Sequence, residues 1–332
     1  MKIRSTGCYI PSVKVDSSKL DRKFRVAPGS VERATGIRTR YHANRVETSP
    51  YMGARAVLDA LHRGGLSMKD VDAVISVSGT AAQLLPCTAS LILEELGELD
   101  SGIAAFDINA TCLGFIVGFD TVSHLIAGGR NDRVVLVATE ASAGAGLLSP
   151  TELESAALFG DGAVAIVVER ARKGDASRVG GWTFATYPRG AHTCELRALG
   201  TTLPPTGKRK PTEKDYYFRM DGPAVFRLTY ALMPPFLDRF LGATGQSISD
   251  FDLIVPHQAS GPALRVMIRR FDSLSSEDKV FVYLREYGNL VAASIPLGIH
   301  LAIEQGRLER GAKVLLVGTG AGLSLGALSF VY

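Results

Sequence analysis

Three widely separated residues carry side chains suited to catalysis: Cys112, His257 and Asn289. A thiolate is a strong nucleophile, an imidazole exchanges protons near neutral pH, and a carboxamide donates hydrogen bonds without titrating. Each of the three follows a run of residues typical of a buried strand, at the point where a turn or helix should begin. Because α/β proteins place ligands and catalytic groups at the carboxyl ends of strands, these three are our candidate catalytic residues.

Cys112 is expected at the amino end of a buried helix. It follows the strand-like run 103–108 and precedes Leu113-Gly-Phe-Ile-Val-Gly-Phe119, which is apolar on every side. Unpaired N–H groups and the helix dipole at such an end should lower the pKa of the thiol from about 8.5 toward 7 or below. Gly114 and Gly118 weaken a helix, which indicates that another surface packs closely there. A small buried core cysteine is the alternative interpretation.

His257 and Asn289 also have simpler interpretations. His257 closely follows the strand-like run 251–255, where an ordinary loop histidine would fit equally well. Asn289 begins a helix-like segment, where an asparagine is commonly just an N-cap. The turn Val317-Gly-Thr-Gly-Ala-Gly322 would let backbone approach a ligand, but it lacks the lysine of a phosphate-binding loop.

Short β-branched runs alternate with longer helical segments, which predicts an α/β fold. The expected strands are 71–77, 103–108, 134–138, 163–168, 251–255, 280–283 and 314–317, and the expected helices are 51–62, 113–127, 225–241, 262–271 and 291–305. The loop 201–215, with three prolines and the basic run 208–210, should be exposed. It is either merely solvated or a docking point for an acidic carrier protein.

Two segments recur at a constant spacing. Residues 66–75 are similar to 246–255, and residues 133–139 to 313–319, each 180 positions further on. We therefore predict a duplicated α/β unit, with one half at 1–172 carrying the cysteine and the other at 173–332 carrying the histidine and asparagine. Two generic α/β units of similar length are the alternative. Equivalent strand ends of a duplicated pair can converge on one cleft between the halves.

Composition narrows the class of protein. The chain has 332 residues, 46% hydrophobic and 21% charged, which is enough apolar material for a large core. A net charge of +4, spread along the chain, does not suggest nucleic-acid binding. Four separated cysteines without a CxxC pair fit neither a disulfide scaffold nor a zinc ribbon, and they suit a cytoplasmic protein without a metal site. No stretch resembles a signal peptide or a bilayer-spanning helix, so no membrane insertion is expected.

Six ordered motifs resemble the β-ketoacyl-[acyl-carrier-protein] synthase III family of thiolase-like condensing enzymes over essentially the whole chain. They are Arg33-Ala-Thr-Gly-Ile-Arg38, Asp107-Ile-Asn-Ala-Thr-Cys-Leu-Gly-Phe115, Phe159-Gly-Asp-Gly-Ala163, Pro256-His-Gln-Ala259, Gly288-Asn289 with Ala292-Ala-Ser-Ile-Pro296, and Gly320-Ala-Gly-Leu323. The resemblance implies a thiolase-like fold, in which two pseudo-duplicated halves form five layers in the order αβαβα.

The resemblance also implies a reaction. Cys112 would take an acyl group from a thioester, and a malonyl thioester would then lose CO₂ and attack that group. His257 and Asn289 would donate hydrogen bonds to the enolate, and backbone N–H groups at Cys112 and in the Gly320-Ala321 turn would hold the oxyanion of acyl transfer. No cofactor is implied apart from substrates that are thioesters of coenzyme A or acyl carrier protein. The implied partners are the carrier protein and a second copy in a homodimer.

Other activities remain open at this stage. An acyltransferase on the same scaffold would pass the acyl group from Cys112 to an alcohol or an amine, although the pair of enolate donors favours condensation. A Cys-His-Asn hydrolase and a carrier-binding module without catalysis fit the sequence less well. A degradative thiolase is disfavoured because the turn near the carboxyl end contains no second cysteine.

Departures from the family pattern bear on the substrate. In the family, a tryptophan and an arginine sandwich the adenine of coenzyme A. This chain has residues 29–32 and Ala34 in the region of that tryptophan and Leu153 in place of that arginine. Their loss should weaken the binding of coenzyme A, which favours a carrier-bound acyl donor. Leu85 is expected to be a small, flexible gate of the acyl pocket, which suggests acyl groups other than acetyl. Arg265 and Arg269, four residues apart on one helix, are either a docking face for an acidic carrier protein or simply solvent-exposed.

Overall fold

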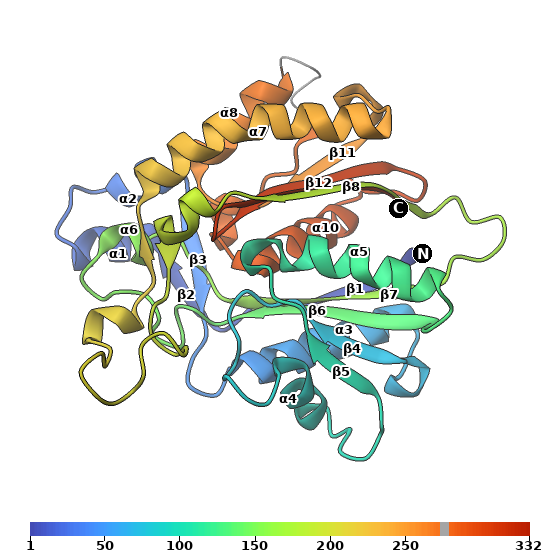
Figure 1. The fold of residues 1–332 in the computed structure, drawn as a ribbon, viewed down its shortest axis with the longest axis horizontal. Helices are drawn as coiled ribbons and strands as arrows, with labels where there is room; N and C mark the ends of the chain where they lie inside the picture. Colours follow the sequence, from blue (N-terminus) through green and yellow to red (C-terminus); the bar gives the residue numbers. More distant parts are fainter. Residues whose placement is uncertain (273–278) are drawn as a thin grey trace.

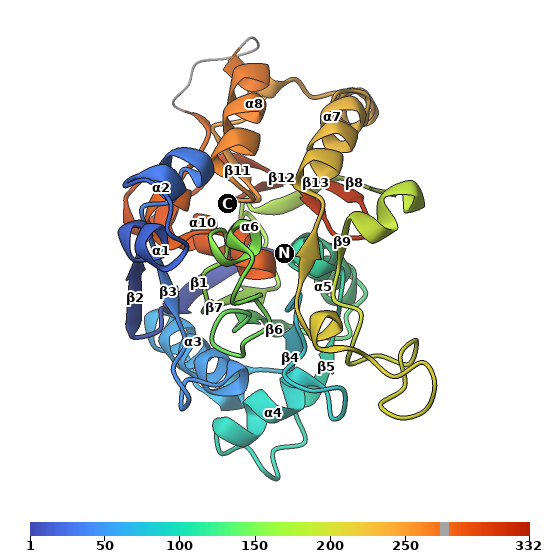
Figure 2. The ribbon, with the colours of Figure 1, turned by 90° about the vertical axis from the view of Figure 1, so that its left-hand side faces the viewer.

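The computed structural model of the protein describes residues 1–272 and 279–332. Two β-sheets are stacked with one pair of helices between them and further helices outside (Figure 1, Figure 2). Helices α5 (Gly114–Ala127) and α10 (Ser294–Glu304) fill the middle layer. Helices α3 (Ser49–Gly64) and α4 (Thr88–Glu95) lie outside one sheet, and α7 (Gly222–Thr244) and α8 (Gly261–Asp272) lie outside the other. The predicted αβαβα order is confirmed.

Both large sheets of the stack are mixed. The first has the order β1-β7-β6-β4-β5, in which β4 pairs in parallel with β5 and β6, and the second has the order β11-β12-β13-β8, in which β11 and β12 are parallel. The strands are β1 (Lys2–Tyr9), β4 (Ala73–Ser76), β5 (Ala104–Asp107), β6 (Arg133–Glu140), β7 (Gly162–Glu169), β8 (Arg178–Thr186), β11 (Leu253–Pro256), β12 (Lys313–Gly320) and β13 (Ser324–Val331).

The remaining elements are short and surround one end of the stacked sheets. They are β2 (Val13–Asp16), β3 (Thr39–His42), β9 (Cys194–Glu195), β10 (Arg219–Met220), α1 (Ser17–Lys23), α2 (Ser30–Thr35), α6 (Leu153–Ala156) and α9 (Leu284–Tyr287). The predicted exposed loop 201–215 has exposed side chains at nearly every position up to its final turn.

The structure repeats at the spacing found in the sequence. Strands β4 and β11 are 180 residues apart, and so are β6 and β12. The details repeat as well, because the N–H of Arg133 donates to the Asp72 carboxylate and the N–H of Lys313 donates to the Asp252 carboxylate, each at 2.8 Å. The connection between β7 and β8 includes the predicted division at residues 172 and 173, which as a domain boundary stays a prediction.

The middle layer forms the main core. Leu113, Phe115, Ile116 and Phe119 are almost completely buried and pack with residues of both sheets and of α10. A helix that is apolar on all sides needs apolar partners all round. The sandwich of α5 between two sheets provides them, and it fixes the amino end of α5 beside the second half.

Two expectations about strands were wrong or incomplete. Residues 280–283 form no strand, and Val280 makes only an isolated bridge to Ile254. The buried side chain of Gln258 bonds instead to the backbone of Phe281, Tyr283 and Leu284, at 3.1–3.3 Å. Strands β1, β8 and β13 were not expected, because their many Gly, Ser and Thr residues conceal the β-branched pattern.

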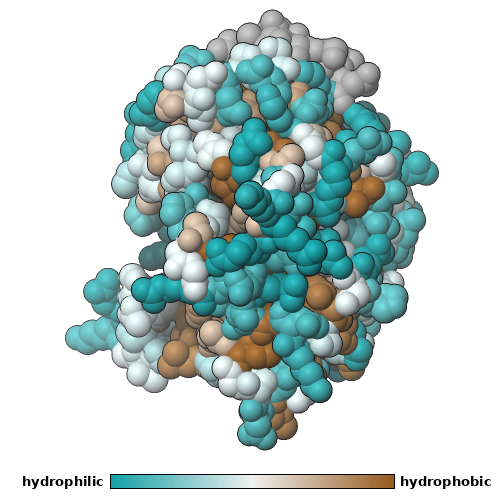
Figure 3. Space-filling model, turned by 90° about the vertical axis from the view of Figure 1, so that its right-hand side faces the viewer, coloured by the Kyte–Doolittle hydropathy of each residue, from teal (hydrophilic) through white to brown (hydrophobic). Residues whose placement is uncertain are grey.

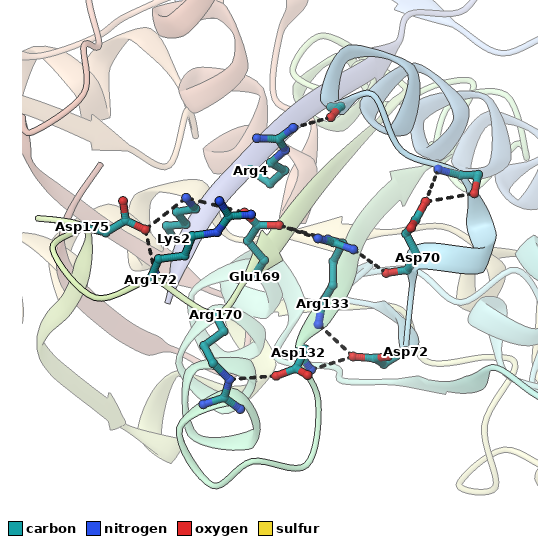
Figure 4. Close-up of polar contacts among 12 residues, drawn as sticks. Lys2, Arg4, Asp70, Asp72, Asp132, Arg133, Glu169, Arg170, Arg172 and Asp175 are labelled. Carbon is teal, nitrogen blue, oxygen red and sulfur yellow. Dashed lines mark hydrogen bonds and ion pairs between the residues drawn. The ribbon is translucent and has the colours of Figure 1, made fainter.

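A network of charged side chains joins three neighbouring strands of the first sheet at one end of those strands (Figure 4). Glu169 at the end of β7 contacts Lys2 Nζ at 3.6 Å and Arg133 Nη2 at 2.9 Å, so β1, β7 and β6 are linked. This network lies at the start of β6, opposite the end that carries Glu140. The face on the right of Figure 1, where β1 starts, is largely hydrophilic (Figure 3).

Candidate active site

Cys112 lies in a 3₁₀ turn, Thr111–Leu113, that leads directly into α5. The turn begins at Thr111, whose φ of 50° is unusual for a residue with a side chain, and the Asn109 carboxamide accepts the N–H of Thr111 at 2.8 Å. A Cβ at Gly114 would lie 2.1 Å from the Val77 carbonyl oxygen, so the close packing expected at this glycine is confirmed. The helix start is thus pressed against the carboxyl end of β4.

His257 follows β11 and is 4% exposed. Its N–H donates to the Val317 carbonyl at 2.8 Å, which ties it to the neighbouring strand β12. Two glycines of β12 allow close packing here, Gly318 within the second half and Gly320 against the first half. A Cβ at Gly318 would lie 2.7 Å from the His257 Cβ, and a Cβ at Gly320 would lie 2.8 Å from Thr111 Oγ1.

Asn289 follows α9, and both the oxygen and the nitrogen of its carboxamide form hydrogen bonds. Its oxygen accepts the N–H of Val291 at 2.9 Å in an Asx turn, and its nitrogen donates to the Ala259 carbonyl at 3.3 Å. The N-cap of the following 3₁₀ turn is Leu290, so the N-cap interpretation of Asn289 was wrong. A carboxamide nitrogen carries two hydrogens, so one remains for a substrate. Asn109 and Asn289 are 180 residues apart and make the same bond to the residue two positions on, which is a further sign of duplication.

The three candidates line one cavity of about 1800 Å³ between the halves, together with Gly320 and Ala321. The prediction that residues distant in sequence converge on one cleft is therefore confirmed geometrically. The other candidate residues lie further out. Arg265 and Arg269 are exposed on α8, and Arg269 lines the cavity.

The loop predicted to gate the acyl pocket reaches the cavity through other residues. Gln83 and Leu84 line it, whereas Leu85 is 84% exposed and projects away from the described lining. Leu85 therefore points outward, and its role as a gate stays a prediction.

The environment of the Cys112 thiol differs from the expectation. Burial, followed by the negative charge of Glu140, raises the pKa of Cys112 to about 12, and the backbone N–H groups of Ala321 and of Cys112 itself lower it by less. The prediction of a depressed pKa was therefore wrong, because desolvation outweighs the helix end. Burial likewise lowers the pKa of His257 to about 4. At neutral pH the resting site holds a neutral thiol and a neutral imidazole.

The backbone groups at the sulfur are those expected to hold an oxyanion. The N–H groups of Ala321 and Cys112 both interact with the thiol, so an oxygen bound to the carbon attacked by this sulfur would lie near both donors. His257 Nδ1 is buried and has no hydrogen-bond partner among the described residues. This leaves the ring free to adopt either neutral tautomer.

Glu140 is the residue of the site that the sequence analysis missed. It ends β6 with 0% exposure, and its carboxylate accepts from the N–H of Gly79 at 2.5 Å, the Thr80 hydroxyl at 2.7 Å and the N–H of Ala292 at 3.3 Å. Burial raises its pKa to about 7. A carboxylate at the end of a strand whose residues 134–138 are all apolar was the available signal.

The lining of the cavity agrees with the departures noted in the sequence. Val31 and Ala34 of the α2 region and Leu153 at the start of α6 line it, so aliphatic side chains stand where the resemblance placed an aromatic ring and an arginine. The described residues contain no cluster of side chains that would hold a metal ion, and no helix among them is long and apolar enough to cross a membrane.

Comparisons with known proteins agree with this geometry. The family model described as 3-oxoacyl-[acyl-carrier-protein] synthase III matches residues 106–188, and the model of its C-terminal part matches residues 241–332. A β-ketoacyl-[acyl-carrier-protein] synthase III of Pseudomonas aeruginosa is 32% identical over 97% of this chain and 94% of its own length.

Solved structures give the same result. The 3-oxoacyl-[acyl-carrier-protein] synthase III of Aquifex aeolicus superposes with a TM-score of 0.87 at 28% identity, covering 100% of this chain and 99% of that one. The priming β-ketosynthase of the R1128 polyketide pathway gives 0.86 at 25% identity, covering 99% and 95%. Sequence, fold and the convergence of Cys112, His257 and Asn289 lead to one conclusion: the chain belongs to the β-ketoacyl-[acyl-carrier-protein] synthase III family of thiolase-like condensing enzymes.

Proposed function

We propose that the protein performs a decarboxylative Claisen condensation in which Cys112 carries the acyl group. The observation that supports this most directly is the presence of Cys112, His257 and Asn289, from both halves, in the lining of one cavity. A nucleophile alone would suit any acyl transfer. Two neutral hydrogen-bond donors facing the same space suit an enolate.

In the first step the Cys112 sulfur attacks the carbonyl carbon of an acyl thioester. The neutral imidazole of His257 takes the thiol proton and passes it to the departing thiolate, so the free thiol of the donor leaves and a new thioester forms on Cys112. The N–H groups of Cys112 and Ala321 stabilise the tetrahedral oxyanion. A thiol with a pKa of about 12 needs such a proton acceptor, because its thiolate population at neutral pH is very small.

In the second step a malonyl thioester occupies the place of the donor. Its C–CO₂⁻ bond breaks, CO₂ leaves, and the electron pair forms an enolate whose oxygen accepts hydrogen bonds from His257 and Asn289. The enolate carbon attacks the acyl carbonyl, a carbon–carbon bond forms, and the Cys112 sulfur leaves as a thiolate that takes a proton from solvent water. Each donor contributes about 3 to 4 kcal/mol to an oxyanion-like transition state.

Carrier-bound thioesters are the proposed substrates. Val31, Ala34 and Leu153 are aliphatic where the family resemblance implies an aromatic ring and an arginine for adenine, and the exposed Arg265 and Arg269 on α8 present positive charge to an acidic carrier protein. The four cysteines are free thiols, which fits the proposed cytoplasmic location.

A homodimer is part of the proposal. Strand β5 is an edge strand of the first sheet, with Ala104 exposed and Phe106 39% exposed. Leu85 is also exposed, and it lies in the loop just before α4. An edge strand with exposed apolar side chains is suited to pairing with a second copy. Leu85 would then reach the partner's cavity.

The test is product formation from purified components. The wild-type protein, given an acyl thioester and malonyl-carrier, should release CO₂ and form β-ketoacyl-carrier, and Cys112→Ser should reduce this at least about 1000-fold. Cys87→Ser is the matched control, since Cys87 is also half-buried but precedes α4. Transfer of the acyl group to an amine or alcohol without CO₂ release would contradict condensation and indicate an acyltransferase.

A further inference from the structure

Strand β3 lies with α1 and α6 at one end of the stacked sheets (Figure 1), and it contains the buried Arg40. This side chain is 0% exposed, and burial lowers its pKa only to about 10, so it is charged at neutral pH. Its Nε and Nη1 have no hydrogen-bond partner among the described residues. Burying a guanidinium is costly, and an apolar side chain of similar size would avoid that cost. The reason for a charge here should therefore lie in the contacts of Nη2.

Nη2 of Arg40 donates to the Ala157 carbonyl at 2.9 Å and to the Ser17 hydroxyl at 3.0 Å. Ala157 is the C-cap of α6, and carbonyls at the end of a helix have no partner within the helix. A cationic side chain can satisfy such a carbonyl. Arg40 thus fixes the point at which the chain leaves α6 and enters the segment 158–160.

The segment 158–160 runs beside Asn289 and bonds both of its backbone groups. The N–H of Asn289 donates to the Leu158 carbonyl at 2.9 Å, and the Asn289 carbonyl accepts the N–H of Gly160 at 3.0 Å. Phe159 and Asn289 thereby form a parallel bridge. Because both backbone groups of Asn289 belong to this pairing, a displacement of the segment would displace Asn289 as well.

The two paired segments pack closely over Arg40. A Cβ at Gly160 would lie 2.2 Å from the Tyr287 carbonyl oxygen, and a Cβ at Gly288 would lie 3.0 Å from the Leu158 carbonyl oxygen. These two positions are also 3.5 Å and 3.4 Å from the Cβ of Arg40. Segments packed at such distances leave no space in which one could move alone.

The neighbours of Arg40 in β3 hold the same region. The Thr39 hydroxyl donates to the Glu286 carbonyl of α9 at 2.7 Å, and the Tyr41 carbonyl accepts the N–H of Asp161 at 2.7 Å. Three consecutive residues of β3 therefore hold α9 and both ends of the segment 158–160. Arg40 acts nearest to the N–H of Asn289, because Ala157 directly precedes the residue that accepts it.

We propose that Arg40 is a positioning residue for Asn289: its bond to the Ala157 carbonyl sets the segment 158–160, and that segment sets the carboxamide that donates to the enolate. The inference rests on the proposed function, because it requires Asn289 to act in condensation. Arg40 is absent from the described lining of the cavity, so it acts through Asn289 and not on the substrate.

The test compares the two half-reactions in Arg40→Met, which keeps an unbranched side chain and removes the donors. Single-turnover acylation of Cys112 should stay within about threefold of wild type, while CO₂ release from malonyl-carrier should fall about tenfold or more. Arg40→Lys restores one donor nitrogen and should release CO₂ at least about threefold faster than Arg40→Met. In protein that already carries Asn289→Ala, Arg40→Met should cause no further loss, because the two residues act in series.

Arg133→Met is the matched control. Arg133 also donates to a backbone carbonyl, that of Asp70 at 2.9 Å, but it does so at the start of β6, in the network of Figure 4. Both half-reactions should remain as in the wild type.

Equal losses of acylation and CO₂ release in Arg40→Met, including complete loss through misfolding, would overturn the inference, because Arg40 would then support the fold as a whole. Wild-type CO₂ release in Arg40→Met, no recovery in Arg40→Lys, or a further loss in the Asn289→Ala background would also overturn it. These results leave the proposed function standing. The proposed function itself fails if the wild-type protein forms no acyl adduct on Cys112 or releases no CO₂.

Discussion

The carboxylate of Glu140, at the end of β6, accepts a hydrogen bond from the backbone N–H of Ala292 at 3.3 Å. Ala292 belongs to the 3₁₀ turn that follows Asn289, and Glu140 also accepts from Gly79 and Thr80 at the start of the gate loop. One buried side chain of the first half thus holds the backbone on both sides of the site. Its negative charge also raises the pKa of Cys112.

Glu140 should make stability depend on pH. Burial raises its pKa from 4.5 to about 7, so between these values the folded state holds the proton more tightly than the unfolded state. Its contribution to stability is complete below pH 4.5 and is lost as the pH rises toward 7, by about 1.4 kcal/mol per pH unit. Denaturant unfolding of the wild type and of Glu140→Gln at several pH values measures this.

The pKa of Asp161 is also raised, to about 6, so Asp161 contributes to the pH dependence of both proteins. The difference in their free energies of unfolding therefore reports on Glu140 alone. The wild type should lose stability relative to Glu140→Gln across this window. Parallel pH profiles for the two proteins would contradict the assignment.

Alkylation of Cys112 should show that the resting thiol is neutral. Because the pKa is raised to about 12, the rate of reaction with iodoacetamide should keep rising through pH 10. Labelling followed by peptide mass spectrometry reports the rate at this site alone. A plateau near pH 7 would instead show the thiolate that the helix end was expected to stabilise.

Much of the site could be predicted from local sequence. The strand ends before Cys112 and His257 and the 180-residue repeat indicated two halves meeting at one cleft, and one cavity is lined by residues of both halves. The glycines at 114 and 118 indicated a closely packed surface, which the structure shows to be Val77. These signals are local because each depends on a few neighbouring residues. The glycine at 114 is a good example, since its missing Cβ is what the Val77 carbonyl requires.

Other features of the site could not be predicted from local sequence, because they depend on residues that are distant in sequence and close in the fold. The pKa of Cys112 is set by burial between two sheets and by Glu140, which is 28 positions away in sequence. Residues 280–283 have the composition of a strand, yet Gln258 takes up their backbone groups. The cavity is lined by both α7 and α8, and no pattern within α7 reveals that α8 contributes to the same lining.

Asn289→Ala should separate the two half-reactions. In the proposed mechanism the amide donates to the enolate of the second step and takes no part in the first, so acylation of Cys112 should stay within about threefold of wild type while condensation falls about 100- to 1000-fold. Single-turnover acylation and steady-state CO₂ release measure the two steps. Equal losses in both would show that Asn289 only supports the fold of the site.

Gly114→Ala should destabilise the protein strongly. The new Cβ would lie 2.1 Å from a backbone oxygen of β4 that cannot move without disturbing the sheet, so we expect a loss of about 3 kcal/mol or more. Gly242→Ala on α7 is the control, because its Cβ would meet no described atom within 4 Å, and it should gain up to about 1 kcal/mol. Urea unfolding of both variants gives the comparison, and similar values for the two would contradict the close approach.

The central claim is that Cys112 carries an acyl group that only a decarboxylating partner removes. Intact-protein mass spectrometry of the wild type, sampled after addition of an acyl-carrier donor and again after addition of malonyl-carrier, tests it directly. We predict an adduct of one acyl group on Cys112 that persists in the absence of malonyl-carrier and disappears with release of one CO₂ when it is added. An adduct on another residue, or one that malonyl-carrier leaves in place, would contradict the account.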